Sequence, residues 1–490
     1  MHSLFSRYCP TITRVVLWLW NSPTFTTWGN YGVQSLRLVL VTPFILTRFD
    51  ETEIAAWYLF ASLNFFGMIV SQRLGLTFSR MFAFAMGGAG NLAPIKGKRE
   101  QENEGKPNWA VFERAYGTIS SINLGIGWLN VVIALGMGWF GLSNLLQGYE
   151  AKATIWLAFA LMQGTALLIF IFQHYQVALQ GMNYIALVNR WGIIFGIASC
   201  LAGSLSLYLG GELITLVVVM QLFSLAGIFR SWFLLRAVEE GRVLHFRQYG
   251  FDREVFGWAW EPTWKGFIGQ FGLNGSMQLT AIIYTGYGSK LEVASFLFSI
   301  RMLQTITQIA QAPFSSVQPL MARLMAAGDI EALGKIIRQR MGYTLALTAV
   351  GVIFGSLAIP LLLQLIGANI DFIPMEAWLL LGGLTLILRF DVLCCAVSAI
   401  GNHIVFYWEM AFATGLATLA SLLVKNEWGV YGPVLASVVP LLIMLNIKPL
   451  QVSSKLLKQV NIPKYAQDFL MLALAYLVGC ALCFGILRMI

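Results

Sequence analysis

The chain has 490 residues, of which 58% are hydrophobic and only 11% are charged, against about 25% charged in an ordinary soluble domain. Its mean hydropathy is +0.71, and apolar stretches of about 20 residues, long enough to cross a hydrocarbon core of about 30 Å, recur along its length. This composition excludes a soluble enzyme, a disordered chain and a nucleic-acid-binding module. We therefore expect an all-α polytopic membrane protein.

Apolar runs interrupted by charge predict thirteen spanning helices, within a range of 12 to 14. The first 27 residues contain Arg7 and Arg14 but no good small-residue cleavage site, so we expect a retained amphipathic lead-in and no cleaved signal peptide. Two sets of six spans and one extra C-terminal span follow. The predicted spans cover 28–47, 54–72, 114–142, 153–173, 184–209, 212–235, 263–286, 291–320, 341–366, 374–400, 404–424, 428–447 and 466–488.

The spans divide the chain into two predicted lobes. Residues 28–236 form an N-lobe with the first six spans, and residues 263–450 form a C-lobe with the next six. A cytoplasmic connector, 237–262, joins them, and residues 451–490 hold a cytoplasmic segment and the extra helix. The segment 73–113 and the connector mix Lys, Arg, Glu and aromatic residues, a pattern typical of amphipathic helices that lie on a membrane surface.

The distribution of basic residues predicts the orientation. Lys and Arg collect in alternate loops, as expected for the cytoplasmic side, when the N-terminus is placed in the cytoplasm. Every outer loop is short, which leaves no room for an outer catalytic domain, so we expect a transporter and not an enzyme. The basic residues predicted on the outer side are Arg48, Lys152, Lys290, Lys425 and Arg488.

The six cysteines do not indicate a metal site or a disulfide framework. Five of them lie within apolar runs, where disulfides and metal ligands are not expected. The Cys480/Cys483 spacing is best interpreted as two small apolar helix residues. The cysteines are Cys9, Cys200, Cys394, Cys395, Cys480 and Cys483.

A short repeat links the two sets of six helices. Glu53-Ile54-Ala55-Ala56-Trp57 follows the first span, and Glu292-Val293-Ala294-Ser295-Phe296 follows the seventh. An even number of spans separates the two copies, so the halves should run parallel and be related by an axis along the membrane normal. We expect a central cavity between the two lobes.

Five ionisable residues lie well inside the predicted spans, and such residues are functional candidates by default. A central arginine costs about 2.5 to 3.5 kcal/mol on the insertion scale, so each should face water, a partner or an anionic ligand. Glu409 is predicted to pair with Arg389 or to be a proton or sodium site, and Asp391 is a candidate for either role. The five residues are Arg37, Arg301, Arg389, Asp391 and Glu409.

Polar residues accompany these charges at helical spacing on three spans. Amides on membrane helices are often interhelical hydrogen-bond partners, but aligned amides next to a guanidinium also suit a wet cavity that binds hydroxyls and phosphate. The stripes are Thr27, Asn30, Gln34 and Arg37 on the first helix; Gln270, Asn274 and Gln278 on the seventh; and Arg301, Gln304, Gln308, Gln311 and Ser315 on the eighth. From these stripes and the other intramembrane arginine, we predict nine substrate-binding residues: Arg37, Arg301, Arg389, Asn30, Gln34, Gln304, Gln308, Asn274 and Gln278.

The stretch Leu36 to Ile45, followed by Glu53-Ile54-Ala55-Ala56-Trp57-Tyr58, resembles the opening of polysaccharide-transporter flippases of the O-antigen type. These belong to the multidrug, oligosaccharidyl-lipid and polysaccharide exporter superfamily. Together with the layout of two times six helices, the resemblance covers about residues 20 to 450. Ala56 stands where many relatives have glycine, and the extra final helix is a second departure.

The resemblance implies a flippase in a bacterial cytoplasmic (inner) membrane that moves a polyprenyl-diphosphate-linked oligosaccharide to the outer leaflet by alternating access. Arg37, Arg301 and Arg389 would then hold the diphosphate or acidic sugars, and the amides would meet sugar hydroxyls. It also implies no cofactor beyond proton or sodium coupling. The partners would be the lipid bilayer, an undecaprenyl-diphosphate-type substrate and a polysaccharide polymerase or other assembly proteins, with the chain itself a monomer.

Three alternatives remain open. A multidrug antiporter of the same superfamily should bind cationic drugs through buried acids, whereas arginines exceed acids in these spans. A membrane polymerase or glycosyltransferase should carry a sizeable loop or domain with acidic metal or nucleotide ligands. A structural or scaffold membrane protein would not need polar stripes on helices of both halves.

Overall fold

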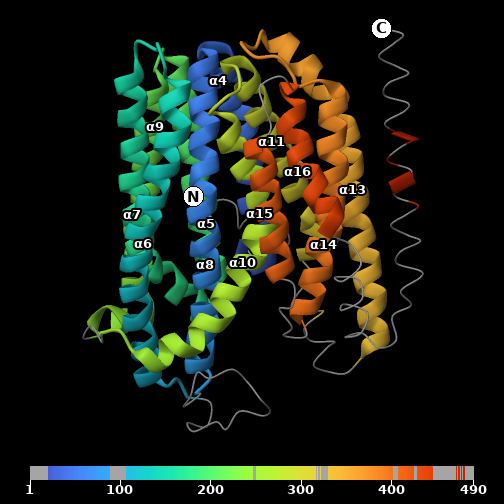
Figure 1. Ribbon diagram of the computed structural model, residues 1–490. Helices are drawn as coiled ribbons and strands as arrows, with labels where there is room; N and C mark the ends of the chain where they lie inside the picture. The colour runs from blue at the N-terminus through green and yellow to red at the C-terminus, as the bar shows by residue number, and fades with distance from the viewer. Residues whose placement is uncertain are drawn as a thin grey trace, which may run out of the picture. The chain divides into compact units, whose positions relative to one another are not determined.

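The computed structural model describes residues 20–88, 106–246, 250–315, 317, 321, 329–400, 407–423, 428–444 and individual positions between 471 and 479. All the regular structure in these residues is helical (Figure 1). The helices are α3 (Pro23–Leu40), α4 (Thr42–Arg48), α5 (Glu51–Met86), α6 (Trp109–Leu145), α7 (Lys152–Gly181), α8 (Ile185–Tyr208), α9 (Leu213–Ala237), the 3-10 helix η1 (Glu239–His245), α10 (Arg253–Tyr284), α11 (Lys290–Ser315), α13 (Ile330–Ile366), α14 (Met375–Ile400), α15 (Tyr407–Leu423) and α16 (Tyr431–Met444).

The predicted all-α polytopic class is confirmed. Each of the first twelve predicted spans contains a helix, and α3 and α4 share the first. Pro43 lies at the start of α4 and has no N–H to donate to the preceding turn, which explains why the first span is broken after Val41. Eight described helices, α5 to α9, α11, α13 and α14, are long and apolar enough to cross a bilayer.

Several helices extend beyond their predicted spans, and this corrects the interpretation of the two charged segments. Residues 73–86 continue α5, and residues 253–262 begin α10, so these parts are extensions of the helices and not separate surface helices. The extension of α5 is covered by other helices: the Phe82 ring stacks on Phe112 of α6 at 4.4 Å between centroids. Residues 89–105, within the first charged segment, lie outside the described residues.

Many large apolar side chains are exposed on the surface of the protein, as expected for contact with lipid. Val132, Trp139 and Leu365 are each more than 60% exposed. Exposure of so many large apolar groups is unusual for a soluble protein but is expected where hydrocarbon is the solvent.

The chain forms two compact units. Unit 1 comprises residues 1–44, 67–136 and 151–264, and unit 2 comprises 45–66, 137–150 and 265–490. The predicted lobes 28–236 and 263–450 follow chain order and stay a prediction.

In unit 1, α3 packs against α8, and α7, α8 and α9 pack against one another. Small residues allow α3 and α8 to approach closely, as in other membrane helix pairs. A Cβ atom added to Gly196 would lie 2.5 Å from Cγ1 of Val33, so only glycine fits there. Ser204 Oγ also donates a 2.9 Å hydrogen bond to the Leu40 carbonyl at the end of α3.

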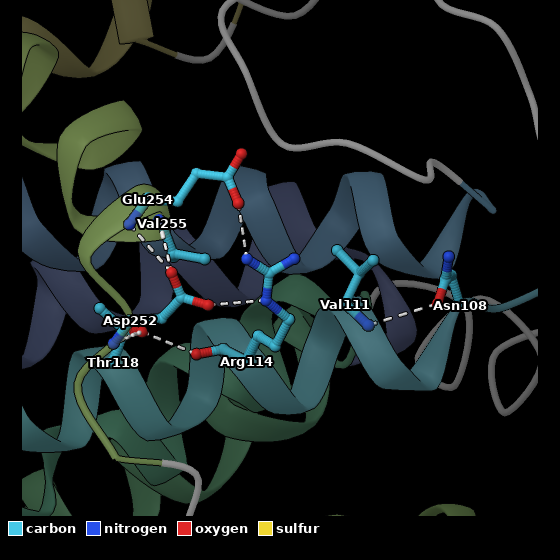
Figure 2. A network of polar contacts seen from close by, with 7 residues as sticks. All are labelled: Asn108, Val111, Arg114, Thr118, Asp252, Glu254 and Val255. Carbon is cyan, nitrogen blue, oxygen red and sulfur yellow. Dashed lines mark hydrogen bonds and ion pairs between the residues drawn. The ribbon is translucent and has the colours of Figure 1, made fainter.

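A polar network in unit 1 fastens the start of α10 to α6 (Figure 2). Arg114 Nε lies 2.7 Å from Asp252 Oδ2, and Arg114 Nη2 lies 2.8 Å from Glu254 Oε2. The other Asp252 oxygen caps α10 by accepting from the backbone N–H groups of Glu254 and Val255. Thr118 Oγ1 accepts from the Asp252 backbone N–H. We name these residues the Arg114 clamp.

In unit 2, the two copies of the short repeat start two helices. Asp50 and Glu53 exchange hydrogen bonds at the start of α5, from Glu53 N to Asp50 Oδ1 (2.8 Å) and from Asp50 N to Glu53 Oε2 (3.4 Å). At the start of α11, Ser289 Oγ accepts from the Glu292 backbone N–H. The repeated acid is therefore the third residue of each helix, the position that closes an N-terminal capping motif.

The same two helices start at the same end of unit 2 and run parallel. Tyr149 lies between their first residues, because its hydroxyl donates to Asp50 Oδ2 at 2.8 Å and its ring lies 5.6 Å from Nζ of Lys290. Further along, the rings of Tyr58 and Phe298 meet edge to face at 5.9 Å. Contact between near-equivalent positions of two parallel copies is expected where an axis along the helices relates them.

The predicted thirteenth span contributes a few described positions, all helical. The Tyr476 side chain is buried, and its hydroxyl donates a 2.7 Å hydrogen bond to the Leu379 carbonyl of α14. A Cβ added to Gly479 would meet Ile353 of α13. This segment therefore packs on α13 and α14.

The close approach of α3 and α8 predicts the effect of one methyl group. Gly196→Ala should lower the apparent melting temperature of the purified protein in detergent, because overpacking costs about 1 to 3 kcal/mol and Val33 is stiff at χ1. Gly136→Ala is the matched control, since nothing lies within 4 Å of its added Cβ. An equal melting temperature for both variants would contradict this account of the contact.

The Arg114 clamp predicts a pH-dependent stability. The hydrogen bond from Arg114 holds the pKa of the Asp252 carboxyl below its usual value of 3.8. The stabilisation is therefore complete above the usual pKa and is lost as the pH falls through the lower pKa of the folded state. Asp252→Asn keeps a capping side chain but removes the charge, so it should cost about 1 kcal/mol at pH 6.

Thermal unfolding in detergent between pH 3 and pH 7 checks this prediction. The gap between the wild-type protein and Asp252→Asn should shrink below about pH 4. Glu254→Gln is the control, because the Glu254 side chain is 60% exposed and its loss should have a smaller effect. A gap that is constant across the whole pH range would show that the charge of Asp252 does not stabilise the fold.

Candidate functional site

The polar stripe of α3 lies in unit 1 and is partly bound within the protein. Asn30 Nδ2 donates a 2.9 Å hydrogen bond to Asn189 Oδ1 of α8. This contact supports the interhelical role for Asn30, which the sequence left as an alternative to ligand binding. Arg37 lies in the last turn of α3 and is exposed. The side chains of Thr27 and Gln34 lie outside the described residues.

The α11 stripe lies in unit 2. Arg301, Gln304, Gln308 and Gln311 are all partly buried on this helix, and Arg301 Nη1 donates to Gln304 Oε1 at 3.3 Å. The stripe therefore provides a row of amides that begins with a guanidinium group. Ser315 uses its hydroxyl within the helix, where it donates to the carbonyls of Gln311 and Ala312.

Arg389 of α14 reaches this stripe. Its Nη1 donates a 2.6 Å hydrogen bond to Gln311 Oε1. Its Nε is buried, and no described atom accepts a hydrogen bond from it. The structure thus brings Arg389 into contact with Gln311 of the α11 stripe, although the two residues are 78 positions apart in the chain.

The α10 stripe is described at one side chain. Gln278 is 2% exposed, and its Oε1 accepts no hydrogen bond from the described residues. The backbones of Gln270 and Asn274 are helical, but their side chains lie outside the described residues. The same holds for Asp391 on α14 and Glu409 on α15, so the predicted pairing of Glu409 with Arg389 stays a prediction.

Some polar residues in unit 1 were missed by the sequence analysis. Asn123 of α6 and Gln163 of α7 are buried, and neither amide has a hydrogen-bond partner among the described atoms. Arg230 of α9 lies over the Phe195 ring, 5.8 Å from its centroid. An amide inside an otherwise apolar span was the available signal for Asn123 and Gln163. Asn189, the partner of Asn30, gave the same signal.

Comparison with known proteins identifies the fold. No family model and no curated protein sequence matches the chain. Among solved structures, the lipid II flippase MurJ in an inward closed conformation has a TM-score of 0.60 at 13% identity, over 93% of this chain and 91% of that one.

Two further similar structures are of a multidrug resistance transporter of the MATE family, described as part of the MOP superfamily. The inward-facing form has a TM-score of 0.62 at 14% identity, over 87% of this chain and 96% of that one. The outward-facing form has a TM-score of 0.56 at 12% identity, over 90% and 98%.

The chain therefore has the all-α fold of MOP-superfamily transporters and flippases. Its apolar helices make it a multi-pass membrane protein. At such low sequence identities the structural similarity defines the fold alone. The TM-scores for the flippase and for the drug transporter are nearly equal.

Proposed function

We propose that this protein is a flippase that moves a polyprenyl-diphosphate-linked oligosaccharide from the cytoplasmic to the outer leaflet by alternating access. The observation that carries the proposal is the contact of two intramembrane arginines, Arg301 and Arg389, with glutamine oxygens of one polar stripe. Cations on an otherwise apolar helix are retained where they serve a ligand or a pathway, and an anionic ligand fits them.

The chemistry of the stripe matches each part of such a substrate. A guanidinium group binds phosphate oxygens through paired N–H donors. Amides such as Gln304 and Gln308 can both donate to and accept from sugar hydroxyls. The prenyl chain needs no polar contact and would remain in the lipid.

The remaining parts of the proposal follow the resemblance of the sequence. The chain would reside in a bacterial inner membrane with its N-terminus in the cytoplasm, act as a monomer and supply a polysaccharide polymerase or other assembly proteins with substrate. Transport would be coupled to protons or sodium ions through Asp391 or Glu409, the two acidic residues that lie well inside the predicted spans.

Mass spectrometry of lipid extracts tests the class of substrate. In cells that lack this protein, complete polyprenyl-diphosphate oligosaccharide should accumulate while surface polysaccharide is lost, because the translocation step is missing. Restoring the wild-type gene should reverse both effects. Unchanged lipids together with increased sensitivity to cationic drugs would instead indicate the multidrug antiporter.

The role of the arginines is tested in the same cells. Arg301→Ala should reduce surface polysaccharide by about tenfold or more, since a charged hydrogen bond is worth about 1.5 to 3 kcal/mol. Arg48→Ala is the matched control, because Arg48 is exposed at the end of α4 and outside the stripe. Full transport by Arg301→Ala at equal expression would argue against the assigned binding role.

A further inference from the structure

The hydrogen-bond partner of Arg389 is an amide and not a carboxylate. Gln311 Oε1 accepts from Arg389 Nη1 at 2.6 Å, a short distance for an N–H donor. Among the described side chains, no Asp or Glu forms an ion pair with Arg389. Arg301 contacts Gln304 in the same manner, through Nη1 and Oε1.

An amide and a carboxylate differ in the charge that they leave on the pair. Glutamine and glutamate have the same length, so glutamate at position 311 would reach the same guanidinium. In a medium of low dielectric constant it would form a strong ion pair and neutralise the arginine. Glutamine fixes the orientation of the guanidinium without neutralising its positive charge at this contact.

Among the described residues, Gln311 is the hydrogen-bond acceptor of Arg389. A guanidinium group has five N–H donors in a rigid plane, and Gln311 accepts from one of them. The Nε donor is buried and without an acceptor in the described part of the chain. A buried, charged donor without an acceptor is costly, and a phosphate oxygen would satisfy it.

We propose that Gln311 is a positioning residue that orients Arg389 and, by being neutral, makes this part of the stripe selective for a phosphate-bearing ligand. The inference rests on the proposed function, because it assigns the diphosphate group of that substrate to Arg389. Gln311 acts through Arg389, whose Nε and remaining N–H groups contact the ligand.

The position of Gln311 on α11 separates this subsite from the other arginine. Gln304 and Gln311 are seven residues apart, which places them on one face of the helix, about 10 Å apart along its axis. Arg301 and Arg389 are therefore bonded to amides two turns apart on one face of α11.

The test compares three variants of the full-length protein: Gln311→Glu, Gln311→Met and Arg389→Ala. Binding is measured on purified protein in detergent as protection from thermal unfolding by inorganic pyrophosphate, and transport is measured in cells as surface polysaccharide. Gln311→Glu should bind pyrophosphate at least about tenfold more weakly and lose transport, because the arginine is neutralised. Its melting temperature without pyrophosphate should equal or exceed that of the wild type.

Weaker pyrophosphate binding without a lower melting temperature in Gln311→Glu would not arise if Gln311 had a purely structural role. Gln311→Met should also weaken binding, because the guanidinium loses its orientation, and it replaces Gln311→Glu if that variant does not fold. Gln339→Glu is the matched control, since Gln339 lies on α13, outside the stripe, and donates to Tyr343 Oη; its binding and transport should be unchanged.

The outcomes separate the inference from the proposed function. Wild-type binding and transport by both Gln311 variants, with an inactive Arg389→Ala, would overturn the role of Gln311 and leave the flippase proposal intact. Wild-type transport by Arg389→Ala as well would remove this subsite altogether. If lipid-linked oligosaccharide does not accumulate in cells that lack the protein, the proposed function itself is wrong.

Discussion

Inside a bilayer, every polar group must find its partner within the protein, because hydrocarbon offers none. This constraint explains the helical structure of the described chain, since a helix satisfies its own backbone. It also explains how hydroxyl groups are accommodated: Ser299 and Thr348, both buried, donate to the carbonyls of Ser295 and Thr344 one turn earlier. Amides and guanidinium groups are too large to be satisfied locally, so they mark the places where helices meet or a ligand binds.

The fold was largely predictable from the sequence, because the apolar length of a span is a property of a continuous segment. The ends of the helices were not, since they depend on residues distant in the chain. The continuation of α5 to Met86 is stabilised by stacking of Phe82 on Phe112, and the start of α10 is held by Arg114. Neither contact can be inferred from the spacing of residues along one segment.

The candidate site shows the same division. The α11 stripe was predictable, since its residues share one face of one helix. The contact between Gln311 and Arg389 was not, because it joins α11 to α14. Nor did the sequence show that Asn30 is bonded to Asn189. Spacing identifies polar residues within a helix, but it does not decide whether each one bonds to a neighbouring helix or is left for a ligand.

The polar stripe of α11 has a consequence for the biogenesis of the protein. Of the candidate spans, α11 has the least apolar membrane-crossing segment, whereas α13 has the most apolar one, and the two helices pack together. A helix with one arginine and three glutamines partitions poorly into lipid by itself. We therefore infer that α11 enters the bilayer together with α13, so that the polar stripe of α11 relies on its neighbour during insertion.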